Sequence, residues 1–92
     1  MKKAPTLPPA PASVPEALVD LIAILFLVTP DQITKDASLA LDLGADELDI
    51  VEFGMNLEET FGIELTDADE ETLETATVAD ILKLLARHEV AL

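Results

Sequence analysis

The sequence predicts an all-α protein, a bundle of three main helices and one short helix with a long loop between the first two main helices. Apolar residues recur at three- and four-residue steps, which is the period of a helix that buries one face. Ser, Thr or Asp caps precede these segments, and no segment alternates apolar and polar residues as a half-buried strand does. With 92 residues, 50% of them hydrophobic, the chain can build one core without disulfides or metals.

The N-terminal stretch differs in composition from the rest of the chain. Residues 1–12 contain four prolines and show no periodicity, so we expect a flexible tail there and a single domain over residues 13–92. Two lysines near the start are followed by prolines and not by an apolar run, so no signal peptide is predicted.

The first helix is expected to begin at a capping box formed by Ser13 and Glu16 and to run to about Val28. It should end there because Thr29 precedes a proline and therefore avoids the helical region. Residues 21–28 are all apolar, a run much shorter than the roughly 20 residues that span a bilayer. We therefore expect a core helix with one side partly exposed, which implies either weak self-association through this helix or a lipid-facing partner surface.

The connection to the second helix carries its own signals. Thr29 and Gln32 form a second capping box, which predicts a short helical turn toward Ile33. Residues 34–45 follow as a long loop. Three of its leucines are expected to pack into the core: Leu39, Leu41 and Leu43.

The second helix is predicted over residues 47–61, capped by Asp46 with Asp49 at the third position and stopped by Gly62. Its core-facing stripe is predicted to consist of Val51, Gly54, Leu57 and Phe61, widened by Phe53.

Two further helices follow, each with a threonine cap. Thr66 caps a brief helix that is rich in acid at its positive end, and Thr77 caps a last helix that runs to about Glu89. The last helix is expected to bury Val78, Ile81, Leu82 and Leu85. His88, near its end, has no partner in the sequence and is interpreted as a solvated positive charge.

Charge and composition exclude several classes of function. Nineteen acids against five Lys or Arg give a formal net charge of −14, and residues 36–80 hold fifteen acids and no Lys or Arg. Such a surface repels nucleic acid and anionic lipid and attracts basic protein patches. The absence of cysteine excludes disulfides, thiolate metal sites and cysteine nucleophiles, and it agrees with a cytoplasmic location.

No residue pattern indicates catalysis or a dedicated metal site. Asp67, Asp69 and Glu71 have the alternate spacing of a calcium loop but lack its glycine and its terminal glutamate. We expect adventitious divalent binding at most, and no enzyme activity.

Residues 36–61 read Asp-Ala-Ser-Leu-Ala-Leu-Asp-Leu-Gly-Ala-Asp-Glu-Leu-Asp-Ile-Val-Glu-Phe-Gly-Met-Asn-Leu-Glu-Glu-Thr-Phe. This segment closely resembles the acyl carrier protein family, in which a loop ending in Asp-Leu-Gly-Ala-Asp-Ser-Leu-Asp leads into an acidic helix. The likeness covers about residues 14–89. It implies an acyl-carrier-protein-like bundle and work in fatty-acid, polyketide or related lipid synthesis.

The family's attachment serine, which carries 4′-phosphopantetheine through its hydroxyl, is replaced here by Glu47. The other serines, Ser13 and Ser38, lie away from that position, so no phosphopantetheine arm is expected on this sequence. Three interpretations of Glu47 stay open: an acid suited to a helix start, which we favour; a mimic of the arm's phosphodiester; or an introduced replacement of a native serine.

The resemblance also implies a docking surface, because the second helix of the family binds Arg and Lys patches of partner enzymes. The corresponding residues here are Asp46, Leu48, Asp49, Glu52, Met55, Glu58 and Glu59.

The main hypothesis is therefore a non-enzymatic docking module without an arm. Two alternatives remain. The first is a genuine acyl carrier whose native residue 47 is serine, with the acyl chain held in the core. The second is a small protein that binds a free fatty acid in the cleft between its helices.

Overall fold

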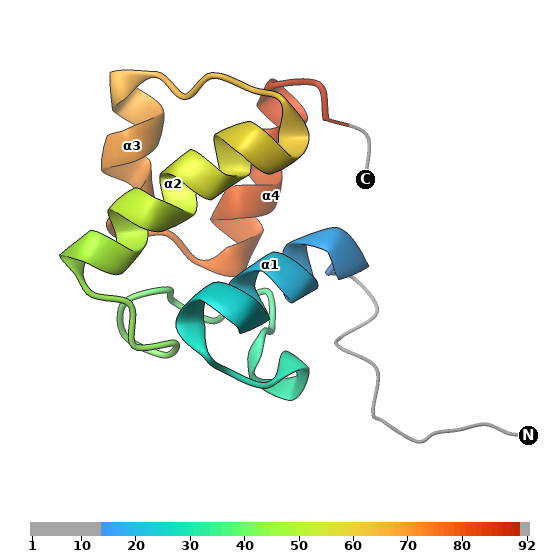
Figure 1. The fold of residues 1–92 in the computed structure, drawn as a ribbon, viewed down its shortest axis with the longest axis vertical. Helices are drawn as coiled ribbons and strands as arrows, with labels where there is room; N and C mark the ends of the chain where they lie inside the picture. Colours follow the sequence, from blue (N-terminus) through green and yellow to red (C-terminus); the bar gives the residue numbers. More distant parts are fainter. Residues whose placement is uncertain (1–13, 91–92) are drawn as a thin grey trace, which may run out of the picture.

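The computed structural model describes residues 14–90, and this part of the chain is all-α (Figure 1). Its elements are α1 (Glu16–Phe26), the short 3-10 helix η1 (Pro30–Gln32), α2 (Glu47–Phe61), α3 (Asp67–Leu73) and α4 (Val78–Arg87). The predicted bundle of three main helices and one short one, with a long loop before α2, is confirmed. The expected tail over residues 1–12 and the cap at Ser13 lie outside the described residues.

Helix α1 is two residues shorter than predicted. It ends at Phe26 because Leu27 adopts a left-handed conformation, with φ of 56°. The backbone N–H of Leu27 and that of Val28 both donate to the carbonyl of Ala23, which closes the helix end. The proline after Thr29 therefore comes too late to end this helix.

The predicted caps of η1, α2, α3 and α4 are all present, and the structure shows that each of them is a full capping box. At α4, for example, the backbone N–H of Thr77 donates to Asp80 Oδ2 over 3.0 Å, and the N–H of Asp80 donates to Thr77 Oγ1 over 3.3 Å. These bonds from Thr77, the backbone one foremost, hold the pKa of Asp80 below its usual value. Because each cap uses short-range contacts, the sequence could locate these helix starts.

The core lies between α1, α2 and α4, and each helix contributes one apolar stripe. Its fully buried side chains include Leu18 and Ile22 from α1, Phe53 and Leu57 from α2, and Ile81, Leu84 and Leu85 from α4. Rings of Phe26 and Phe53 meet with centroids 5.4 Å apart, tilted by 53°, so an aromatic pair joins the end of α1 to α2.

Two core positions predicted in the helices were wrong by one or two residues. Val51 is 54% exposed, and Ile50, at 6%, takes its place on the buried stripe of α2. Leu82 is only half-buried, whereas Leu84 is completely buried. Both stripes keep the helical period, but the face that the neighbouring helices cover is rotated from the one predicted.

The long loop before α2 is hydrogen-bonded to the start of α4. The N–H of Leu39 donates to the carbonyl of Ala76 over 3.1 Å, and the N–H of Val78 donates to that of Ala37 over 3.0 Å. Leu39 and Leu43 are buried as predicted.

Leu41 was predicted to be buried and is instead 88% exposed. Its N–H donates to Ser38 Oγ over 3.1 Å, within a turn that also bonds the N–H of Asp42 to the carbonyl of Ser38. That turn directs residue 41 away from the core.

None of the helices within residues 14–90 combines the length and the apolar character needed to cross a membrane.

Candidate functional site

The start of α2 is fixed by two aspartates that cap each other. The N–H of Asp49 donates to Asp46 Oδ1 over 2.9 Å, and the N–H of Asp46 donates to Asp49 Oδ2 over 3.0 Å. Both carboxylates were predicted to contact partners, which stays a prediction; each also caps the helix start. Glu47 is the first helical residue and is exposed, where its negative charge suits the positive end of the helix.

Four of the predicted docking residues form one continuous line along α2. Leu48, Glu52, Met55 and Glu59 follow each other at steps of four, three and four residues, which places them on a single helix face. All four are exposed, Leu48 to 67% and Met55 to 52%. We call this line the docking face; it alternates apolar and acidic side chains.

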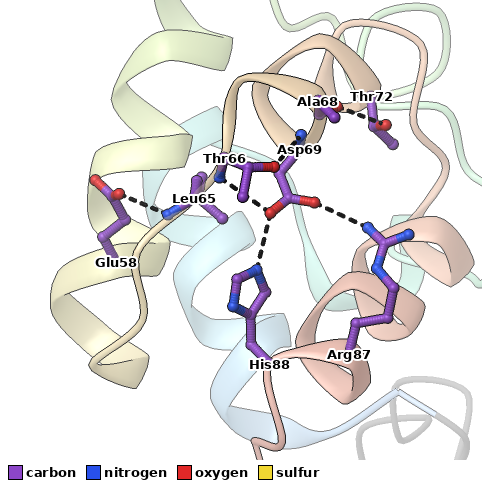
Figure 2. A network of polar contacts seen from close by, with 8 residues as sticks. All are labelled: Glu58, Leu65, Thr66, Ala68, Asp69, Thr72, Arg87 and His88. Carbon is purple, nitrogen blue, oxygen red and sulfur yellow. Dashed lines mark hydrogen bonds and ion pairs between the residues drawn. The ribbon is translucent and has the colours of Figure 1, made fainter.

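Glu58, for which contact with partners stays a prediction, has a structural role as well. It is half-buried, and its Oε2 accepts the backbone N–H of Leu65 over 2.8 Å (Figure 2). This bond ties α2 to the link that leads into α3. Sequence spacing alone could not reveal it, because the two residues are joined by a turn at Gly62 whose geometry is needed to bring them together.

A groove of about 220 Å³ lies between α2 and α3, beside the docking face. The two helices approach closely at Gly54, where an added Cβ would lie 3.3 Å from Leu73 Cδ1 and 3.5 Å from Leu65 Cδ1. Nine residues line it: Glu47, Ile50, Val51, Gly54, Met55, Glu58, Glu70, Leu73 and Glu74. Val51, predicted as core, is thus a wall of this groove.

A polar network joins the start of α3 to the end of α4 (Figure 2). Asp69 is 6% exposed; its Oδ1 accepts Arg87 Nη2 over 3.0 Å, and its Oδ2 lies 2.8 Å from His88 Nε2. The predicted solvated role of His88 is therefore wrong, since its side chain is only 22% exposed and is paired. The partner lies nineteen residues earlier, and no local pattern could have identified it.

The same network sets the ionisation of Asp69. Its hydrogen bond with His88 and its bonds with Thr66 hold the pKa of this carboxyl below the usual value, although burial opposes the shift. Asp69 thus has partners within the protein. Among residues 14–90, no group of three or more acidic or histidine side chains converges in a way that could hold a metal ion.

Comparisons with known proteins place this arrangement in a family. The model of the family described as "Phosphopantetheine attachment site" matches residues 16–85. The acyl carrier protein of Syntrophobacter fumaroxidans is 45% identical over 74 residues, which is 80% of this chain and 89% of that protein. The acyl carrier protein of Lactobacillus johnsonii is 40% identical over 72 residues, or 78% of this chain and 88% of that protein.

A third similar protein, the acyl carrier protein of a Sulfurovum species, is 47% identical over 58 residues, covering 63% of this chain and 75% of its own length. The family match runs from the start of α1 to two residues before the end of α4. This chain therefore belongs to the acyl carrier protein family, whose members are carriers and not enzymes.

Proposed function

We propose that this chain serves fatty-acid, polyketide or related lipid synthesis as an acyl-carrier-type protein that binds basic surfaces of the enzymes through its docking face. The observation that carries the proposal is the line of Leu48, Glu52, Met55 and Glu59, exposed along a helix whose opposite side is buried. Membership of the acyl carrier protein family supports it.

The chemistry of the docking face suits short-lived association. A net charge of −14 attracts basic partners over a distance and raises the rate of encounter. Leu48 and Met55 then supply small apolar contacts between the acids. Binding of this kind is fast and readily reversed, as a protein that visits several enzymes requires.

We further propose that residue 47 of this sequence carries no 4′-phosphopantetheine. Attachment uses a hydroxyl oxygen, and the side chain at the helix start is the carboxylate of Glu47. Ser38 is the one serine among the described residues; its Oγ accepts the N–H of Leu41 in the loop that is bonded to α4. The residues present therefore do not fit the group, and we assign no chemistry to it.

A second candidate function is acyl transport itself. The family and the curated relatives are carriers, and these matches favour a native protein with serine at position 47, in which Glu47 is a replacement. The codon at position 47 of the native gene decides between the two. A serine codon would make acyl transport the function, and a glutamate codon would leave docking without an arm.

Loading is tested by the intact mass of the chain after co-expression with a phosphopantetheinyl transferase. We expect no added mass on the chain with Glu47 and the mass of one arm on a Glu47→Ser variant, which serves as the matched control. Added mass on the unaltered chain would disprove the loss of the attachment site.

Docking is tested with the same transferase, immobilised and titrated with the protein at low salt. Reversal of two exposed acids, Glu52→Lys with Glu59→Lys, should weaken binding about tenfold or more, because each lost attraction becomes a repulsion. Reversal of two exposed acids on α1, Glu16→Lys with Asp20→Lys, changes the net charge equally and should have a much smaller effect. Equal effects of the two pairs would reduce docking to nonspecific charge attraction. Glu58 is unsuitable for this test because it bonds to the backbone of Leu65.

A further inference from the structure

The exposed side of α1 changes character along the helix. Glu16, Asp20, Ile24 and Leu27 follow at steps of four, four and three residues, which places them along one side, and all four are exposed. This side is acidic where the helix begins and apolar where it ends. Ile24 and Leu27 are exposed to 72% and 91%, and Leu27 is the most exposed large hydrophobic residue within residues 14–90.

Leu27 is also an unfavourable residue for its position. Its φ of 56° is left-handed, a conformation that strains a leucine and suits a glycine. Within residues 14–90 the side chain gains no burial that would offset this strain. A leucine that is both strained and exposed fits a contact with something outside the described part of the chain.

The small size of this apolar surface decides what can cover it. A stable interface between separate proteins takes roughly 20–30 residues a side, whereas the end of α1 offers two strongly exposed apolar side chains. Two copies of this chain would also repel each other, because each has a net charge of −14. A tethered segment of the same chain binds more readily, since its effective concentration is on the order of millimolar.

The segment that precedes α1 has a matching composition. Residues 1–13, which lie outside the described range, contain one leucine, Leu7, with Pro8 and Pro9 directly after it and Pro5 two residues before it. Proline-rich chain favours the polyproline II form, which loses little conformational entropy when it binds an apolar surface. Leu7 and its prolines therefore suit a small apolar surface that is held only by a weak contact.

The length of the segment matches the length of α1. The chain bends at Val14, so the preceding residues can run back along the helix. The six steps from Ser13 to Leu7 then span about 19 Å in polyproline II form, and the eleven steps from Glu16 to Leu27 span about 17 Å of helix. Leu7 therefore reaches the level of Leu27.

Charge favours the same course. Residues 1–15 contain Lys2 and Lys3 and no acid. When Leu7 is level with the end of α1, the two lysines extend beyond that end, where η1 contacts α1 and presents the exposed Asp31. Opposite charges at this end help to hold the segment in place, although an exposed pair contributes little by itself.

We propose that residues 5–9 bind the apolar end of α1, with Leu7 against Ile24 and Leu27. The contact lies within one molecule, and its occupant is the chain's own N-terminal segment. It covers the side of α1 through which self-association is expected. The inference is independent of the proposed function, because it involves no residue of the docking face.

Spin labelling tests the contact in the full chain. Because the sequence contains no cysteine, an Ala4→Cys substitution can take a single nitroxide label. We expect this label to broaden the amide signals of residues 24–33 more than those of α3. Ala12→Cys, close to the start of α1, controls for the labelling and should broaden the first turn of α1. Broadening from Ala4→Cys that is absent at residues 24–33, or equal over every exposed helix, would overturn the proposal.

Variants on the helix test whether the apolar side chains hold the segment. In the Ala4→Cys background, Ile24→Ser with Leu27→Ser should reduce the broadening at the end of α1 about threefold or more. Both residues are largely exposed, so the fold should tolerate the change, and unshifted amide signals in α2 and α4 check this. The matched control is Leu41→Ser, at an 88% exposed leucine outside α1, which should leave the broadening unchanged. Equal effects of the pair and the control would contradict a specific contact.

Mixed samples distinguish the chain's own segment from that of a second copy. Nitroxide-labelled protein without isotopes is added to isotopically labelled protein without nitroxide. A contact within one molecule predicts no broadening in this mixture. Broadening at residues 24–33 in the mixture would place the segment on a second copy and overturn the proposal.

Discussion

Helices α1 and α2 are both packed on the same core, but they are specified in different ways. Helix α2 has a capping box at its start and Gly62 in the left-handed conformation at its end, so its own residues define its limits. Helix α1 is preceded by Pro15, which makes no side-chain cap, and is followed by Leu27, a non-glycine residue with φ of 56°. Its limits depend on the packing of the rest of the protein.

The exposed sides of the two helices also differ. Helix α2 presents alternating acids and small apolar contacts, whereas the end of α1 presents Ile24, 72% exposed, and Leu27, 91% exposed. The expected partial exposure of α1 is thus confirmed, and weak self-association through it stays a prediction. A helix whose ends are fixed by its own caps can present a regular surface. A helix whose ends depend on packing leaves apolar side chains exposed where the neighbouring elements no longer cover it.

The largest effect is expected from a substitution that removes the packing of α2 against α1. Phe53→Ala empties a fully buried site beside Phe26 and should lower the free energy of unfolding by about 3–5 kcal/mol, measured by urea denaturation. Met55→Ala, on the exposed side of α2, should cost less than about 0.5 kcal/mol. In the Phe53 variant, hydrogen exchange should increase in α1 before α2. Protection that falls equally in the two helices would contradict the dependence of α1 on packing.

Helix α3 is held to α4 in a third way, by charged side chains. Asp69→Ala should cost roughly 1.5–3 kcal/mol at neutral pH, because it removes hydrogen bonds to Arg87 and His88. Since the pKa of Asp69 is lowered in the folded protein, its contribution is present above the ordinary value of about 3.8 and is lost as the pH falls through the lowered value. The stabilities of the variant and the parent should therefore converge in acid. Asp67→Ala, an exposed acid of the same helix, should show no such convergence.

A smaller effect is expected at the start of α2. Asp46→Ala removes the acceptor for the N–H of Asp49 and should cost about 1 kcal/mol in the free energy of unfolding. Asp20→Ala removes the same charge from an exposed position inside α1 and should stay within about 0.5 kcal/mol. A comparable loss from Asp20→Ala would show that charge, and not capping, stabilises α2.

The smallest effects should have opposite signs at the two helix ends. Leu27→Gly relieves a left-handed leucine that is almost wholly exposed and should stabilise the protein by about 0.5–1 kcal/mol. Gly62→Ala introduces a Cβ at φ of 67° and should destabilise it by about 1 kcal/mol. Thermal unfolding of the two variants measures both. A loss of stability from Leu27→Gly would mean that this side chain contributes to the fold.

Sequence reasoning succeeded where the determining contacts are local. The caps at Thr29, Asp46, Thr66 and Thr77 bond to residues three apart, so these helix starts could be recognised directly. It failed where distant elements decide the outcome. The pairing of His88 with Asp69 depends on how α4 packs beside α3, and the exposure of Val51 depends on the groove between α2 and α3.

The exposure of the residues proposed for docking was predicted in part. Leu48, Glu52, Met55 and Glu59 are exposed as a partner surface requires, while Glu58 is held by the backbone of Leu65. The role of Glu58 could not be predicted because it depends on the path of the chain after Gly62. The groove between α2 and α3 was missed for a related reason: its lining combines residues from two helices that are well separated in the sequence.

The bonds between the long loop and the start of α4 have a consequence for folding during synthesis. The N–H of Leu39 and the carbonyl of Ala37 find their partners at Ala76 and Val78. While the ribosome has released only the first half of the domain, these groups have no native partner. The loop that leads into α2 can therefore complete these bonds only after the start of α4 has been made, so the path of the chain before residue 47 is set by a segment that is synthesised after α2.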